Sequence, residues 1–213
     1  SAVFSVVAVA AAVIFGGFYV QGKKSVQTIR EQARTLNDSY VDEPAVTPER
    51  MDINLTHRGN TLAAEAQLVF INERQTPVSR YIFNLNPGLE IKRITSGGSD
   101  VAFKRNMHLV FITPESPLKT GQQDSLRFDY EGGIEEDIAY LDATREMIER
   151  QYKIWVYNID KRSSFVTPDY VLLTRESMWY PRSGVTYSPA RPQAFSRHFI
   201  DFRLTVATRP GLL

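Results

Sequence analysis

The sequence contains only three histidines, His57, His108 and His198, and no cysteine. A zinc hydrolase of the His-Glu-x-x-His type needs two histidines one helical turn apart, with the glutamate as general base. No two of these histidines have that spacing, so we interpret all three as structural. The absence of cysteine excludes thiolate-ligated zinc, iron–sulfur clusters and thiol catalysis.

Two groups of carboxylates could also be taken for a catalytic or metal site. Asp129 and Glu131 share one face of a predicted strand, and we expect that face to meet solvent. Glu135, Glu136 and Asp137 stand at the start of a predicted helical stretch, where the helix dipole favours acidic residues. We therefore interpret these three as a solvated helix start rather than as metal ligands.

Other catalytic signatures are missing as well. The chain has no G-x-S-x-G elbow and no phosphate-binding glycine loop followed by lysine, and its glycine pairs, Gly97-Gly98 and Gly132-Gly133, are typical of turns. With a formal net charge of +1, the chain lacks the excess of positive charge that is typical of nucleic-acid-binding proteins. We expect no catalytic residue, no cofactor site and no metal ligand in this chain.

Residues 1–22 carry no charge, and Lys23 and Lys24 end the run. As a helix the stretch would be about 33 Å long, enough to cross a hydrocarbon core of roughly 30 Å. We predict a transmembrane helix, cut by the start of the sequence. A buried helix of a soluble protein and a secretory signal peptide remain alternatives, although a signal peptide needs a basic stretch before its apolar run.

The next part of the chain, 23–48, is polar. Val26, Ile29, Ala33 and Leu36 follow a helical spacing, so we predict a juxtamembrane stalk helix that continues the first helix. A membrane-surface helix and a partner-binding helix are the alternatives. Two prolines in the segment DEPAVTP then break the helix, and we place the linker there.

Residues 49–213 change to a period of two, which is typical of half-buried strands. The predicted strands are 61–72, 80–85, 89–95, 125–131, 153–157, 169–174 and 199–207, with a hairpin of 101–104 and 109–113 around Arg105-Asn106. One helix over 134–152 interrupts them. In the last strand we expect Ile200, Phe202, Leu204 and Val206 to be the buried set. The predicted fold is mainly β: an antiparallel β-sandwich or saddle-shaped sheet with one inserted helix, preceded by the transmembrane and stalk helix.

Several phrases of this β-region occur in a familiar order: "GNTLAAEAQLVFIN", "RYIFNLNPGLEIKRIT", "PLKTGQQDSLRFDYEGGI" and "WYPRSGVTYSP" followed by "FIDFRLTVATRPG". Met51 to Leu213 resembles the N-terminal β-domain of the aminopeptidase-N-like (gluzincin) zinc metallopeptidases. With the helix in front, it further resembles a bacterial subgroup fused to the membrane helices of ABC-transporter-type permeases. One departure is that Tyr187-Ser188-Pro189-Ala190 occupies the place of the family's acidic-Glu-Pro signature.

The resemblance implies a non-catalytic, membrane-tethered domain that walls and supports the cleft of a catalytic domain further along the same chain. Zinc would belong to that domain of the parent, and this fragment itself would have no enzymatic activity. The implied partners are the downstream domain, membrane lipid and an ABC ATPase subunit. The implied location is the bacterial inner membrane, with the β-domain outside the cytoplasm. Trp179, Tyr180 and Pro181 are candidate domain-interface anchors, although they could equally fill the core.

Two other hypotheses need no peptidase. The chain could be a stalked extracytoplasmic β-sandwich that binds a protein or peptide. It could also be a structural or assembly subunit of a transport complex.

Overall fold

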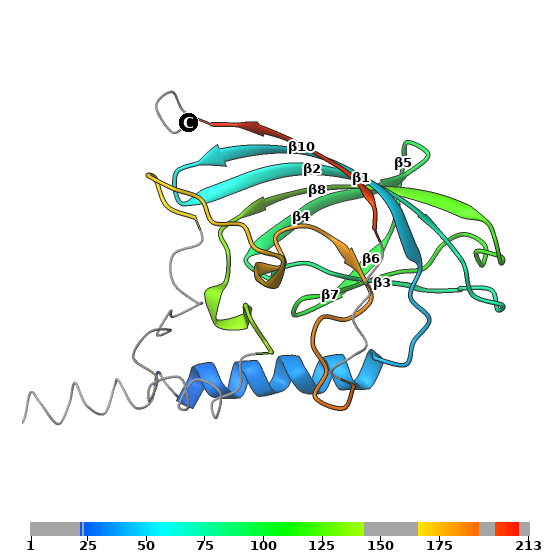
Figure 1. The fold of residues 1–213 in the computed structure, drawn as a ribbon, viewed down its shortest axis with the longest axis horizontal. Helices are drawn as coiled ribbons and strands as arrows, with labels where there is room; N and C mark the ends of the chain where they lie inside the picture. Colours follow the sequence, from blue (N-terminus) through cyan, green and yellow to red (C-terminus); the bar gives the residue numbers. More distant parts are fainter. Residues whose placement is uncertain (1–21, 23, 143–165, 192–198, 209–213) are drawn as a thin grey trace, which may run out of the picture.

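The computed structural model describes residues 22, 24–142, 166–191 and 199–208. Two β-sheets lie face to face, and a helix formed by 24–40 lies outside the smaller sheet, which gives a sheet–sheet–helix arrangement (Figure 1). The predicted membrane span, except Gly22, and the predicted strand 153–157 fall outside the described residues. Within those residues, no helix has both the length and the apolar character needed to cross a membrane.

The larger sheet has six strands in the order β10-β1-β2-β8-β4-β5. All of its strand pairs are antiparallel except β1 with β10, which run parallel over seven registered residue pairs from Arg50–Asp201 to Thr56–Ala207. The predicted antiparallel β-fold is therefore confirmed, with one parallel pair as an exception. The strands are β1 Thr47–Arg58, β2 Thr61–Ile71, β4 Leu89–Ser96, β5 Ser99–Asp100, β8 Gln123–Gly132 and β10 Asp201–Ala207.

The smaller sheet has four strands in the order β6-β7-β3-β9. The strands are β3 Tyr81–Asn84, β6 Phe103–Asn106, β7 Leu109–Ile112 and β9 Arg182–Ser183. The predicted β6–β7 hairpin is present, but its turn falls at Met107-His108 rather than at Arg105-Asn106. Arg105 stays in the strand because its guanidinium donates to four backbone carbonyls, those of Leu85, Asn86, Leu89 and Met107.

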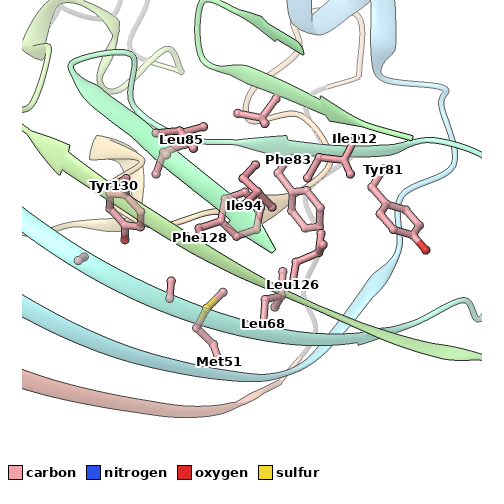
Figure 2. Close-up of a cluster of buried hydrophobic side chains, with 14 of the residues drawn as sticks. Met51, Leu68, Tyr81, Phe83, Leu85, Ile94, Ile112, Leu126, Phe128 and Tyr130 are labelled. Atoms are coloured by element: carbon pink, nitrogen blue, oxygen red, sulfur yellow. The ribbon is translucent and has the colours of Figure 1, made fainter. Parts of the chain in front are cut away.

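The main core lies between the two sheets and is built from the side chains that the period of two predicted (Figure 2). Aromatic rings from both sheets meet edge to face at its centre. The Phe70 ring lies 4.9 Å from Tyr81 and 5.8 Å from Phe83, and Phe83 lies 5.4 Å from Phe128. Each of these four side chains is no more than 1% exposed, so the alternation correctly separated the inner face from the outer one.

Two predicted elements are not formed as expected. The described part of the predicted helix 134–152, which ends at residue 142, contains only the 3-10 turn η1 Glu136–Ile138, because Ala139 is extended and Tyr140 takes a positive φ of 51°. Of the predicted strand 169–174, the structure contains a single bridge between Val166 and Val171. Here the Thr167 hydroxyl accepts from the backbone nitrogens of Asp169 and Tyr170, a local turn that competes with strand pairing.

The helix 24–40 forms where the sequence predicted one, but it is docked on the β-domain rather than standing clear of it. Arg30, Ala33 and Asn37 form its buried face. The Arg30 guanidinium donates to the carbonyl oxygens of Asp137, Ala139 and Tyr140 at 2.6–2.8 Å. These contacts join residues more than 100 positions apart and hold the helix on the domain.

Candidate functional site

The three candidate interface anchors follow the 3-10 turn η2 Arg175–Ser177. Trp179 is only 5% exposed and belongs to the main core, whereas Tyr180 is half-buried. The Tyr180 ring lies 4.8 Å from that of Trp179 and 5.6 Å from that of Phe202 on β10. Trp179 thus fills the core, and Tyr180 extends the aromatic cluster to the edge of the larger sheet, where Pro181 is buried beside it.

Of the four residues predicted to be buried in the last strand, Ile200 is half-buried against the main core. The prediction is wrong for Phe202, Leu204 and Val206. They stand in register with Met51, Ile53 and Leu55, so they share the core side of the sheet. Yet they are 39%, 43% and 49% exposed. The cause is their place on β10, the edge strand of a six-stranded sheet that faces only four strands. We call these three side chains the edge stripe.

Two pockets share Arg175 and Arg182 in their walls, and one of them is lined by Tyr180 and Phe202 of the aromatic cluster. The first has a volume of about 270 Å³, and its lining also includes two acids, Asp142 and Glu176. The second, which we call the arginine pocket, has a volume of about 240 Å³, and none of the described residues in its wall is a carboxylate. The residues that line the arginine pocket are Pro48, Met51, Arg175, Tyr180, Pro181, Arg182, Ser183, Ile200 and Phe202.

Arg182 is paired with Asn84 in the β3–β9 register, and its backbone carbonyl also accepts from Asn84 Nδ2 at 3.0 Å. Its half-buried guanidinium has no hydrogen-bond, ion-pair or ring partner among the residues that the structure describes. Burial lowers the pKa of Arg182 and the neighbouring charge of Arg175 lowers it further, while Tyr180 and Glu176 offset only part of this effect. Arg182 was not a candidate from the sequence, because only Trp179, Tyr180 and Pro181 of the phrase "WYPRSG" were considered there.

A larger polar pocket of about 550 Å³ lies beside the β7–β8 connection. Three acids line it, Asp100, Glu115 and Asp124. Asp124 accepts from the Tyr81 hydroxyl at 2.8 Å and from the Ser125 backbone nitrogen at 2.7 Å. Burial raises the pKa of Tyr81, and Asp124 raises it further. Tyr81 therefore remains a neutral donor that fixes this carboxylate, and the pair has a structural role.

His57 and His108 are buried and hydrogen-bonded. His57 Nε2 lies 2.6 Å from the Gly59 carbonyl oxygen and 2.9 Å from that of Thr167, so this nitrogen is the donor. His108 Nε2 donates to Asn37 Oδ1. Both imidazoles thus make hydrogen bonds within the fold, and His198 lies outside the described residues. No three His, Asp or Glu side chains in the described ranges are grouped so as to hold a metal ion, so these residues do not fit a zinc site.

The carboxylates of β8 face outward, as predicted, and are paired with basic side chains. Asp129 accepts from Arg127 at 2.9 Å and from Arg93 at 3.1 Å, and Glu131 lies 3.2 Å from the Lys92 ammonium. Burial by itself raises the pKa of Asp129, but the hydrogen bonds from both arginines outweigh it and the net pKa is lowered. These groups form a surface ion-pair network without the raised pKa that a general acid would need.

The acidic residues at 135–137 mark the start of the 3-10 turn. The Glu135 side chain accepts from the Asp137 backbone nitrogen, which caps η1. Glu136 and Asp137 follow in its first turn. Their interpretation as the start of a helical turn is confirmed, with the 3-10 turn in place of an α-helix.

Comparison with known proteins gives a partial likeness to one class of solved structure. A mutant of a two-domain M1 zinc metallopeptidase bound to L-tryptophan matches with 24% identity and a TM-score of 0.40, over 44% of this chain and 22% of that one. The M1 zinc metallopeptidase from Deinococcus radiodurans matches with 23% identity and a TM-score of 0.40, over the same shares. This chain thus spans about a fifth of the length of either structure, and at these scores the likeness carries no argument. No protein-family model and no curated protein matches the chain.

Proposed function

We propose that residues 49–213 are the non-catalytic N-terminal β-domain of a larger, membrane-tethered zinc aminopeptidase-like protein. In that protein the domain packs against a downstream catalytic domain and supports its cleft. The ordered sequence phrases of the β-region motivate the choice of family. The uncharged stretch 1–22 motivates the membrane tether, and the resemblance to permease-fused proteins motivates an ABC ATPase partner.

The edge stripe is the observation that supports a docking role. Phe202, Leu204 and Val206 extend the apolar core face beyond the strands that cover it, and Tyr180 continues the same surface. On the other face of β10, Arg203 lies 3.8 Å from Asp52 and 3.6 Å from Asp201, so that face is charged. A strand that is apolar on one side and charged on the other fits a partner on the apolar side only.

The test is to express the polypeptide encoded downstream of Leu213 separately and to measure its binding to this chain. We expect a His-Glu-x-x-His helix in that polypeptide, zinc bound to it, and a stable complex with the 213-residue chain. Leu204→Glu should weaken the complex at least tenfold, because it would place a charge in an apolar interface.

Thr205→Glu is the matched control, since it adds the same charge on the opposite face of the same strand. Its affinity should stay near that of the unmodified chain. Equal binding by both variants would contradict the assigned interface. A downstream polypeptide that neither binds zinc nor associates with this chain would contradict the proposed function.

A further inference from the structure

The arginine pocket has the chemistry of a binding site that the packing of the domain does not explain. A half-buried guanidinium normally makes ion pairs or hydrogen bonds, because burying an unpaired charge is costly. Elsewhere in the described structure the rule holds: the buried Arg30 donates to three backbone carbonyls, and the half-buried Arg105 donates to four. Arg182 is the exception, since the described residues provide no hydrogen-bond or ion-pair acceptor for its guanidinium.

The walls of the pocket show what kind of acceptor would fit. Among the described residues, two arginines and no carboxylate line it, and the described acid that acts on Arg182, Glu176, lies outside this wall, so the unpaired Arg182 guanidinium favours an anion. The remaining wall is mainly apolar and aromatic, with Met51, Tyr180, Ile200 and Phe202 facing the same space. A small inorganic anion would leave the apolar wall exposed to water. An organic carboxylate with an apolar group could pair with the guanidinium and also cover the apolar wall.

We propose that the pocket between η2, β9 and β10 binds an organic carboxylate with a small apolar or aromatic body. The carboxylate pairs with the Arg182 guanidinium, with Arg175 beside it, and the body packs on Tyr180 and Phe202. A planar guanidinium suits this ligand because it can donate two parallel hydrogen bonds to one carboxylate. The inference goes beyond the proposed function and does not depend on a downstream domain.

Calorimetric titration of the full 213-residue chain with phenylacetate tests the proposal, with phenylacetamide as the uncharged isostere and acetate as the anion without a body. We expect phenylacetate to bind with a Kd below about 1 mM, and both comparison ligands to bind at least tenfold more weakly. Arg182→Gln should weaken phenylacetate binding at least tenfold. Arg58→Gln, which removes an exposed arginine from the outer face, should leave it unchanged.

Two further measurements keep the result interpretable. Arg182→Lys retains the charge and should retain part of the affinity if Arg182→Gln proves unstable. The tripeptide Gly-Gly-Phe, compared with its C-terminal amide, tells whether the carboxylate can also come from the end of a polypeptide. Failure of phenylacetate and of the tripeptide to bind, or equal binding of phenylacetate and phenylacetamide, would overturn the proposal.

Discussion

His108 Nε2 lies 2.8 Å from Asn37 Oδ1, and this hydrogen bond joins the β6–β7 turn to the N-terminal helix. Asn37 Nδ2 donates to Thr186 Oγ1 and to the Tyr187 carbonyl oxygen, so Oδ1 is the acceptor and His108 Nε2 carries the proton. His108 Nδ1 has no hydrogen-bond partner among the residues that the structure describes. Burial, together with the nearby charge of Arg105, lowers the pKa of His108 to about 3. The bond therefore depends on a neutral imidazole.

Acid should weaken the fold through His108. In the unfolded chain the imidazole takes up a proton near pH 6.5, whereas in the folded chain it stays neutral until about pH 3. The unfolded state binds more protons between these values, so the free energy of unfolding falls as the pH drops. The His108 contribution to that loss should be about 2 kcal/mol between pH 6.5 and 4.5.

Urea unfolding at several pH values measures this dependence. His108→Gln keeps a donor near Asn37 but cannot titrate, so its unfolding free energy should vary less over the same range. A slope equal to that of the unmodified chain would contradict the role given to His108.

Removing the Arg30 guanidinium should loosen the N-terminal helix. Arg30→Met would leave the buried carbonyls of Asp137, Ala139 and Tyr140 without their donor, which should lower the free energy of unfolding by about 2–4 kcal/mol. Limited proteolysis should then cut first in the linker after residue 40. Gln32→Ala, on the exposed face of the same helix, should change stability by less than about 0.5 kcal/mol.

Gly132 should not tolerate a side chain. It has a φ of 144°, and a Cβ there would overlap the Gly88 carbonyl oxygen. Gly132→Ala should therefore lower the free energy of unfolding by about 3 kcal/mol or more. Gly97→Ala is the matched control, since Gly97 also has a positive φ but has open space around it, and it should cost only about 1 kcal/mol. Equal losses would show that the overlap is relieved by movement of the backbone.

The loss of unfolding free energy on replacing a phenylalanine by alanine should depend on how deeply the ring is buried. Phe83 is fully buried between the sheets, so Phe83→Ala should cost about 3–5 kcal/mol in denaturant unfolding. Phe202 is 39% exposed on the edge strand, so Phe202→Ala should cost about 1 kcal/mol in the same experiment. A loss at Phe202 as large as that at Phe83 would contradict the exposure of the edge stripe.

The alternation of side chains along a strand could be recognised from sequence because it depends only on the strand itself. It correctly separated Leu126, Phe128 and Tyr130 from the charged side chains between them. The same pattern failed on β10, because the burial of Phe202 also depends on which strands lie opposite. Long-range hydrogen bonds, such as those of Arg30, have no local signal, and Arg182 stands out only when its surroundings are known.

The parallel pairing of β1 and β10 also has a mechanical consequence. A force applied between the start of β1 and the end of β10 would act along the two strands in opposite directions. It would load the seven registered pairs together instead of opening them one after another. The domain should therefore resist tension along that line far better than tension across the β1–β2 hairpin, whose two free ends lie side by side.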